Sequence, residues 1–365
     1  TLFRSTHKGF IGIGRLIGLG CCESVTFTAK SQGERIISKL TCDSDLMREL
    51  LTSDTKFTVD EVLKQINKFS QEFTSDTESH YFIVELNEIK SDHDYLLDVD
   101  DVKKSLEFVV PLPYSNNFHE FSTQIHEHAK EIGYKIDEYK IFLNDEQVFK
   151  PYNTIFPVSG GDDEIREIQF WDIRDKNNNL FAWMWYGISS FKGVIKDGCP
   201  MRGIRLRKEN IQIGSDDIMQ VQKLFPEDRG NHFFIGELFC VSKSLIPTTP
   251  RDYFVENPAR KALENYLRVV FENKLSKFYR VSSQIRSSLK KIDDLKKIIE
   301  DNQDRLDQGL YHDEERRVQL EDEINKSESD ISKRKAAIDK YKSSSETINR
   351  IAEYIEIELR NSDKG

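Results

Sequence analysis

Apolar residues recur every three or four positions from residue 257 onward, through the C-terminal part of the chain. This spacing is typical of long amphipathic helices that pack against each other. Pro258 stands where a helix accepts proline in its first turn, and Gly309 interrupts the pattern. We therefore predict an antiparallel coiled-coil hairpin over residues 257–365, with a second arm that runs through residues 313–359.

The middle of the chain alternates short apolar runs with polar turns rich in Asn, Asp and Gly, a pattern that predicts strands. The predicted strands are Tyr134–Leu143, Gln147–Phe149, Ile165–Ile173, Leu180–Ser189 and Asn231–Val241. A short helix, Asp216–Leu224, precedes the last strand, with Asp216 as its N-cap. We assign residues 133–256 to a second domain. We expect Trp171, Trp183 and Trp185 to be core or interface aromatics rather than platforms for a ligand.

The N-terminal part of the chain mixes the two patterns, and we assign residues 1–132 to a first domain. Strands are predicted at Glu23–Lys30, Gly33–Cys42 and Tyr81–Ile89, the last of them buried, and helices at Asp60–Phe69, Asp100–Val110 and Phe118–Ile132. Pro111 ends the second of these helices. Along the third lie His119, His126 and His128, without a carboxylate placed as a third metal ligand. We expect these histidines at the surface and predict no metal site.

Composition limits the class of protein. The 365 residues suffice for two domains and an appendage, and 23 Phe and 13 Tyr supply ample core material. A net charge of −10 argues against a generally basic nucleic-acid binder. None of the five cysteines stands in C-x-x-C spacing, which fits a reducing compartment. No apolar run approaches about eighteen residues and no signal core is visible, so we expect a cytoplasmic protein without a membrane partner.

Three glycines near the start of the chain stand in the spacing G-x-x-G-x-G. The run is Lys8, Gly9, Phe10, Ile11, Gly12, Ile13 and Gly14. Glycine lets backbone N–H groups approach a polyphosphate closely, and the apolar residues after Gly14 predict a short helix whose N-terminus faces the turn. A polar segment precedes Gly9 where a Rossmann fingerprint needs a strand, and Gly14-Arg15-Leu16 does not match a Walker loop.

At these residues the chain resembles the GHKL ATPases, the Bergerat-fold superfamily that includes the ninety-kilodalton heat-shock chaperones, MutL and the MORC proteins. In that superfamily a polar ATP lid runs into a G-x-x-G-x-G box, then a helix, then antiparallel strands. The resemblance implies an α+β chain: a partial Bergerat-fold α/β sandwich, a transducer like domain 2 of ribosomal protein S5 with a left-handed β-α-β crossover, and the helical hairpin. It implies ATP and Mg²⁺ as cofactors, with residues 8–14 around the phosphates.

Adenine recognition departs from the superfamily pattern. The strand after the glycine box usually offers a Thr just before a Lys, with the Thr pointing into the adenine pocket. Here Ala29 precedes Lys30, and Thr28 is one residue away. Thr28 is the candidate that this register leaves, unless the pocket uses another polar atom.

A second stretch, Gly203–Gly214, carries the basic residues. A strand is predicted at its start, followed by a cationic turn of Arg205, Arg207 and Lys208. By composition this is a solvated turn, but the run resembles the catalytic loop of the chaperones, where the transducer sends one Lys or Arg to the γ-phosphate. By that register Lys208 is the sensor, with Arg207 and Arg205 as alternatives. A cation there would stabilise charge on the phosphoryl oxygens and make the interdomain angle depend on the γ-phosphate.

The remaining superfamily motifs do not occur before Gly9. They are a Glu-x-x-x-Asn helix and an Asp-x-Gly-x-Gly loop, which supply the general base, the Mg²⁺ ligand and the adenine-reading aspartate. The resemblance therefore implies a chain that begins within the nucleotide domain, with the Mg²⁺ ligand in the missing N-terminal segment. ATP hydrolysis is expected of the full-length protein and not of this fragment alone.

Two classes of function stay open. The first is an ATP-dependent conformational switch that acts as a homodimeric clamp on a client protein or nucleic acid. The alternative is a non-catalytic interaction scaffold built on the coiled coil. Basic residues on the first arm of the hairpin interleave with acidic ones, which favours a solvated face over a nucleic-acid groove. Chaperoning, DNA compaction and antiviral defence all remain compatible with the sequence.

Overall fold

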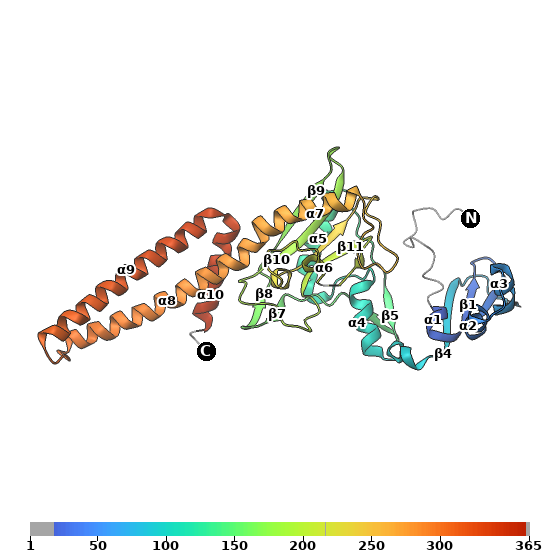
Figure 1. Cartoon of the computed structure of the whole chain (residues 1–365), viewed down its shortest axis with the longest axis horizontal. Helices are drawn as coiled ribbons and strands as arrows, with labels where there is room; N and C mark the ends of the chain where they lie inside the picture. Colours follow the sequence, from blue (N-terminus) through green and yellow to red (C-terminus); the bar gives the residue numbers. More distant parts are fainter. Residues whose placement is uncertain (1–17, 216, 363–365) are drawn as a thin grey trace. The chain divides into compact units, whose positions relative to one another are not determined.

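The computed structural model describes residues 18–215 and 217–362 and is mixed α+β (Figure 1). Contacts divide the chain into two compact units, Thr1–Leu106 and Glu107–Gly365. The division falls before helix α5 (His119–Glu131), which the sequence assigns to the first domain and which packs in the second unit. The glycine turn, residues 8–14, and Asp216 lie outside the described residues.

The first unit contains one four-stranded antiparallel sheet in the order β3-β2-β1-β4. Its elements are α1 (Gly18–Cys21), β1 (Cys22–Lys30), β2 (Ile36–Asp43), α2 (Ser44–Thr52), α3 (Val59–Ile66), β3 (Asn67–Phe73), β4 (Tyr81–Ile89) and the 3₁₀ turn η2 (Ser91–Leu96). The predicted strands are confirmed. The helix predicted over residues 60–69 ends early: it begins at a capping box of Thr58 and Glu61, and Phe69 belongs to β3.

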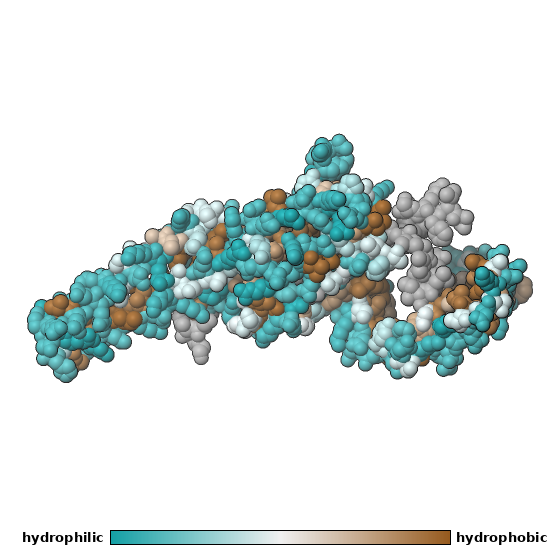
Figure 2. Space-filling view, viewed as in Figure 1, coloured by the Kyte–Doolittle hydropathy of each residue, from teal (hydrophilic) through white to brown (hydrophobic). Residues whose placement is uncertain are grey.

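One face of this sheet is apolar but only partly covered: Val25 on it is fully buried, whereas several of its neighbours are exposed. Phe27 pairs with Leu40 on one side and Val84 on the other, and Leu40 pairs with Phe69, so the four side chains share a face. Phe69 is 65% exposed and Val84 44%, and Phe82, against Phe27, is 60% exposed. The prediction of a buried strand at residues 81–89 is therefore wrong about burial, although the strand exists. Figure 2 shows apolar residues at the surface of this unit.

The second unit is built on a five-stranded mixed sheet in the order β12-β11-β13-β10-β9, with β11 and β13 parallel. Its strands are β9 (Glu167–Arg174), β10 (Leu180–Ile188), β11 (Gly203–Lys208), β12 (Ile211–Ile213) and β13 (Ile235–Cys240), with α6 (Ile218–Val221) and the 3₁₀ turn η4 (Gly230–Phe233) between the last two. Parallel neighbours need such a crossover connection. The strand predicted from residue 231 begins at Ile235, after η4.

Both faces of the sheet are buried. On one face α5 contributes Phe121 and Ile125 to a cluster that contains Trp183 and Trp185. On the other, α7 (Pro258–Val270) and α10 (Glu346–Ser362) pack on apolar side chains of β10, β11 and β13. The prediction of core tryptophans is confirmed for Trp183 and Trp185, which are fully buried, whereas Trp171 is partly buried.

Shorter elements complete the second unit. They are η3 (Asn116–Phe118) and the hairpins of β5 (Ile141–Leu143) with β6 (Glu146–Val148) and β7 (Ile155–Val158) with β8 (Gly161–Glu164). The division between the units falls within α4 (Val99–Val109), whose last residues belong to the second unit. Pro111 follows α4, as predicted. The strand predicted over residues 134–143 is confirmed only for its last three residues.

The helical hairpin is confirmed. A short π-helix, η5 (Phe271–Leu275), joins α7 to α8 (Ser276–Asp307), and α9 (Glu314–Ser344) returns beside α8 (Figure 1). Gly309 lies at the turn with φ +67°. The predicted single second arm is wrong: the helix breaks at Ser345, and α10 packs against the sheet. Among the helices that the structure describes, none is long and apolar enough to cross a membrane.

The close approach of β13 to β10 generates a stability prediction. A Cβ on Gly236 would lie 2.4 Å from the backbone oxygen of Trp185. We expect Gly236→Ala to lower the free energy of unfolding by about 3 kcal/mol, because two strands would have to separate. The measurement is urea unfolding followed by tryptophan fluorescence. Gly20→Ala, whose Cβ meets nothing within 4 Å, is the control. An unchanged midpoint for Gly236→Ala would contradict the prediction.

Candidate functional site

The basic residues of the second motif lie in a strand and not in a turn. Every residue of β11 is buried, and Arg207 and Lys208 pair with Gln212 and Ile211 of β12. The predicted solvated turn is therefore wrong for these residues. Successive side chains of a strand point to opposite faces of the sheet, so Arg207 and Lys208 have different surroundings.

Arg207 lies inside a fully buried ion cluster centred on Glu237 of β13. Arg207 Nε donates to Glu237 Oε1 at 2.7 Å, and Lys150 Nζ donates to the two carboxylate oxygens at 3.1 and 3.2 Å. The Tyr114 hydroxyl donates to Oε2, and Trp185 Nε1 lies 3.4 Å from the same oxygen. We call these five residues, together with Asn210, the Glu237 cluster.

The cluster holds two cations against one carboxylate. Burial by itself would raise the pKa of Glu237, but Arg207 and Lys150 lower it to about 2. Burial lowers the pKa of Lys150 to about 8, and Glu237 opposes that shift. Arg207 Nη1 donates to the backbone oxygen of Phe108, in the last turn of α4, where the helix end carries partial negative charge. The positive charge that Glu237 does not balance is therefore stabilised by neutral oxygens, those of Phe108 and Asn210.

A tight turn follows β11. Glu209 and Asn210 connect β11 to β12 with φ of +53° and +61°, the conformation of a two-residue type I′ hairpin. Glu is strained in this region, at a cost of about 1 kcal/mol or more. Asn210 is fully buried: its Oδ1 accepts from Lys150 Nζ at 2.8 Å, and its Nδ2 donates to the backbone oxygen of Asp137 at 2.8 Å. The turn is therefore fastened to the Glu237 cluster.

Lys208 lies at the start of this turn and is 5% exposed. Its Nζ donates to the backbone oxygens of Ser242 at 2.7 Å and Val241 at 3.4 Å, beyond the end of β13. Burial lowers the pKa of Lys208. Lys208 makes no ion pair with any residue in the described part of the chain. Its ammonium group is thus largely desolvated and hydrogen-bonded to neutral oxygens, and the charge of the neighbouring Glu209 carboxylate opposes the lowering of its pKa.

The alternatives to Lys208 are occupied. Arg207 is fully buried and could reach a ligand only by leaving Glu237. Arg205 is 6% exposed, donates to Gln212 Oε1 and to the backbone oxygen of Pro200, and lies over the Phe108 ring at 3.9 Å. Of the three basic residues that the sequence singles out, Lys208 is the one whose charge is not committed to a carboxylate or an aromatic ring.

Thr28 is the one predicted nucleotide-binding residue that the described residues include. It lies on β1 opposite Lys39 and Ile83, is 5% exposed, and its hydroxyl has no hydrogen-bond partner among residues 18–215 and 217–362. A buried hydroxyl without a partner is costly, which fits a position that receives a polar ligand. Ala29, the register expected from the superfamily pattern, is exposed instead. The other predicted residues of the glycine turn lie outside the described part.

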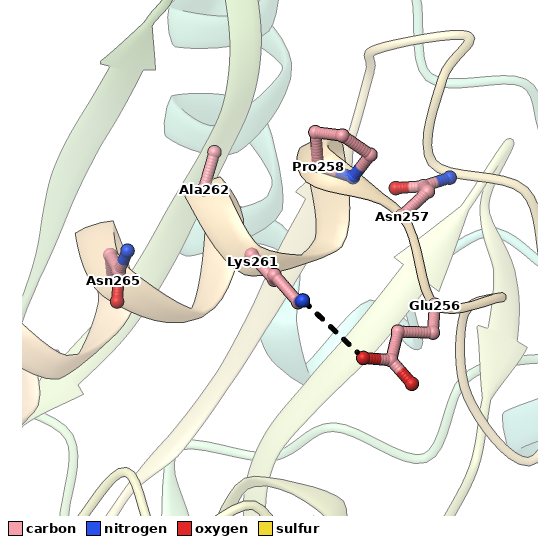
Figure 3. Close-up of a pocket in the computed structure, with 6 residues that line it drawn as sticks. All are labelled: Glu256, Asn257, Pro258, Lys261, Ala262 and Asn265. Carbon is pink, nitrogen blue, oxygen red and sulfur yellow. Dashed lines mark ion pairs between the residues drawn. The ribbon is translucent and has the colours of Figure 1, made fainter.

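The open depressions at the surface contain fewer features of a binding site than the buried residues described above. One lies at the start of α7 and is lined by Glu256, Asn257, Pro258, Lys261, Ala262 and Asn265 (Figure 3). Lys261 lies 3.5 Å from Glu256, and both side chains are about two-thirds exposed or more, so water screens this pair. Across residues 18–215 and 217–362, no group of three or more His, Cys, Asp or Glu could hold a metal ion.

The histidines of α5 make specific contacts. His128 Nε2 lies 2.9 Å from Asp172 Oδ1 and its ring stacks on Phe170, and it is only 18% exposed at the side chain. His126 Nε2 lies 3.1 Å from Glu138 Oε1. The prediction of surface histidines is therefore wrong for His128, which is largely buried.

Comparison with known proteins adds no identification: no family model matches the chain, and no curated protein matches it.

Lys150, Tyr114 and Glu237 were not identified from the sequence as residues of a site. Glu237 did leave a signal, since it is a single carboxylate in the otherwise apolar run from Phe233 to Val241. Such a residue inside a buried strand requires a cationic partner. The sequence could not say which of the basic residues supplies it.

Replacing the central carboxylate should destabilise the second unit. We expect Glu237→Gln to lower the free energy of unfolding by about 3–5 kcal/mol, because two buried cations would lose their counter-charge. Urea unfolding followed by tryptophan fluorescence measures the change. Glu346→Gln, which removes a surface partner of Arg350, is the matched control and should change it by less than about 1 kcal/mol. Equal effects of the two substitutions would contradict a special role for Glu237.

The pair of His126 and Glu138 predicts a pH effect. The hydrogen bond to Glu138 raises the pKa of His126 above its usual value near 6.5. The stabilisation is therefore complete below about pH 6.5 and is lost as the pH rises through the higher folded-state pKa. We expect His126→Gln to flatten the fall in urea midpoint between about pH 6 and pH 8. His119→Gln is the control; a wild-type profile for His126→Gln would refute the assignment.

Proposed function

We propose that this chain is part of an ATP-dependent conformational switch of the GHKL class, in which Lys208 senses the γ-phosphate. The observation that carries the proposal is the state of Lys208: a buried ammonium group, at the mouth of a strained turn, with neutral oxygens as partners. Phosphate oxygens would supply a counter-charge in direct contact with Lys208, whereas among the described residues Glu209 acts on it without forming an ion pair. The alternating strand geometry favours Lys208 over Arg207, whose charge Glu237 already balances.

The first unit offers two features that fit a nucleotide domain. Thr28 presents a buried hydroxyl without a partner on one face of the sheet. The other face exposes Phe69, Phe82 and Val84, so a further layer would be needed to bury it. In our proposal these faces belong to a Bergerat-type α/β sandwich, with residues 8–14 around the phosphates.

The second unit would act as the transducer. ATP, with Mg²⁺, would supply the transferable γ-phosphoryl group, and the Mg²⁺ ligand and general base lie elsewhere in our proposal. The contribution of this chain is electrostatic: Lys208 would stabilise the charge that develops on the phosphoryl oxygens. Because Lys208 begins the turn after β11, a bound phosphate would also favour one position of that strand.

The hairpin would carry the mechanical output. Its visible face is mostly hydrophilic (Figure 2), which suits an arm that projects into water and meets a partner transiently. In this proposal the protein acts in the cytoplasm as a homodimer that clamps a client protein or nucleic acid. The competing proposal is a scaffold without nucleotide chemistry, for which the buried and neutralised state of Arg207 is the supporting observation.

The test uses the native full-length polypeptide. We expect Lys208→Met to lower the kcat of ATP hydrolysis by about 10²-fold while nucleotide affinity changes little, because the lost contact acts on the transition state. A steady-state phosphate-release assay and calorimetric titration with a non-hydrolysable ATP analogue give the two values. Lys261→Met, which removes an exposed lysine of α7, is the matched control.

Two outcomes would decide against this function. If the full-length protein neither binds nor hydrolyses ATP, the scaffold proposal replaces it. If ATP is hydrolysed but Lys208→Met turns over at the wild-type rate, Lys208 is not the sensor.

A further inference from the structure

The Glu237 cluster joins parts of the second unit that are far apart in the chain. Tyr114 precedes η3, Lys150 follows β6, Trp185 lies on β10, and Arg207 lies on β11. All of them reach one carboxylate by direct hydrogen bonds or, for Trp185, through Tyr114 at 3.2 Å. A fully buried set of this kind tolerates little displacement, since each lost bond leaves a desolvated charge.

The Glu237 cluster is hydrogen-bonded to two segments outside the sheet core, the end of α4 and the turn after β11. Through Arg207 it reaches the backbone oxygen of Phe108, at the end of α4, and Arg205 covers the ring of the same residue. Through Lys150 it reaches Asn210, the second residue of the turn that follows Lys208. We call the turn of Glu209 and Asn210 the sensor turn. The end of α4 and the sensor turn are therefore both linked to Glu237, the first through Arg207 and the second through Lys150.

Lys150 is the joint between them. An ammonium group has three protons, and Lys150 directs them at Asn210 Oδ1 and the two oxygens of Glu237. Its backbone is fixed as well: its N–H donates to Pro113 and its oxygen accepts from Ser115, both at about 3 Å. The left-handed conformation of Glu209 persists only where its surroundings impose it. Asn210 is hydrogen-bonded to Lys150 and to the backbone oxygen of Asp137, and these bonds hold Glu209, its neighbour, in that conformation.

We propose that Lys150 and Glu237 are positioning residues that hold the sensor turn and the C-terminal end of α4 on one rigid base, so that a displacement of either is felt by the other. The relevance of the turn to γ-phosphate sensing rests on the proposed function, but the coupling itself does not. It requires only that removal of Lys150 loosens both segments while the sheet around them keeps its order.

Hydrogen–deuterium exchange of the native protein without nucleotide tests the coupling. Lys150→Met keeps the length of the side chain and removes the ammonium group. We expect exchange at least tenfold faster in peptides that cover residues 104–112 and 205–214, and less than threefold faster across β10. Glu358→Gln, which weakens a separate ion cluster of α10 with Arg286 and Ser190, is the matched control and should leave both peptides unchanged.

A second variant covers the case that Lys150→Met does not fold. Asn210→Gly suits the left-handed turn and removes only the grip of Lys150 and Asp137 on it. It should loosen residues 205–214 tenfold, and residues 104–112 to a smaller but measurable extent. Wild-type exchange at both segments, or equal loosening of the whole sheet, would overturn the inference for either variant.

The kinetic readout separates this inference from the proposed function. With ATP, Lys150→Met should lower kcat while KM stays within about twofold, since a misplaced sensor acts on the transition state rather than on binding. If exchange changes as expected but the wild-type protein hydrolyses no ATP, the coupling stands and the proposed function fails. If the wild-type protein is active and Lys150→Met matches it in both exchange and kcat, the coupling fails alone.

Discussion

The second unit depends on keeping one carboxylate charged in a place that water does not reach. Glu237 stands in the middle of the sheet, on a strand whose other residues are apolar or glycine, and it is tolerated because Arg207 and Lys150 approach from two sides. Replacement of such a set by well-packed apolar residues is often neutral or stabilising, so burial of charge is a poor route to stability alone. What the set does provide is direction, because a hydrogen bond weakens steeply away from its preferred angle and the donors are therefore held in fixed orientations around Glu237.

This constraint explains the division of labour among the basic residues of β11. A strand that alternates its side chains puts Arg205 and Arg207 on the face covered by the aromatic cluster, and Lys208 on the other. The two arginines, whose planar groups donate to several partners at once, lie in the interior. The lysine, a compact charge on a flexible stem, lies at the end of the strand and bonds backbone oxygens beyond the end of β13.

The sequence predicts the parts of the fold that follow a period. The helical hairpin, the core tryptophans of β10 and the strands β1, β2 and β4 of the first unit all follow from spacing, whereas spacing does not predict β3. The end of β11 does not, although Ile204 and Leu206 alternate with Arg205 and Arg207, because three charges in four residues imitate a solvated turn. The break at Ser345 is hidden by an apolar repeat that continues across it, and only the run of three serines, which favour helix starts, marks it. The burial of β4 is a tertiary property, and its composition says nothing about what covers it.

Helix α10 packs against the first part of α8 and so fixes the base of the helical hairpin. Ile351 and Ile355 of α10 pack into the same core as Ile285 near the start of α8, and Arg286 of α8 bonds Glu358 of α10. The arm is thus clamped at its root and unsupported beyond it, like a cantilever. Beyond Arg286, α8 runs to Asp307, which is about 21 residues or roughly 32 Å, so a tilt of about 10° at the root would move the tip by roughly 5 Å. Small adjustments in the sheet would therefore appear at the far end as displacements of about one helix radius.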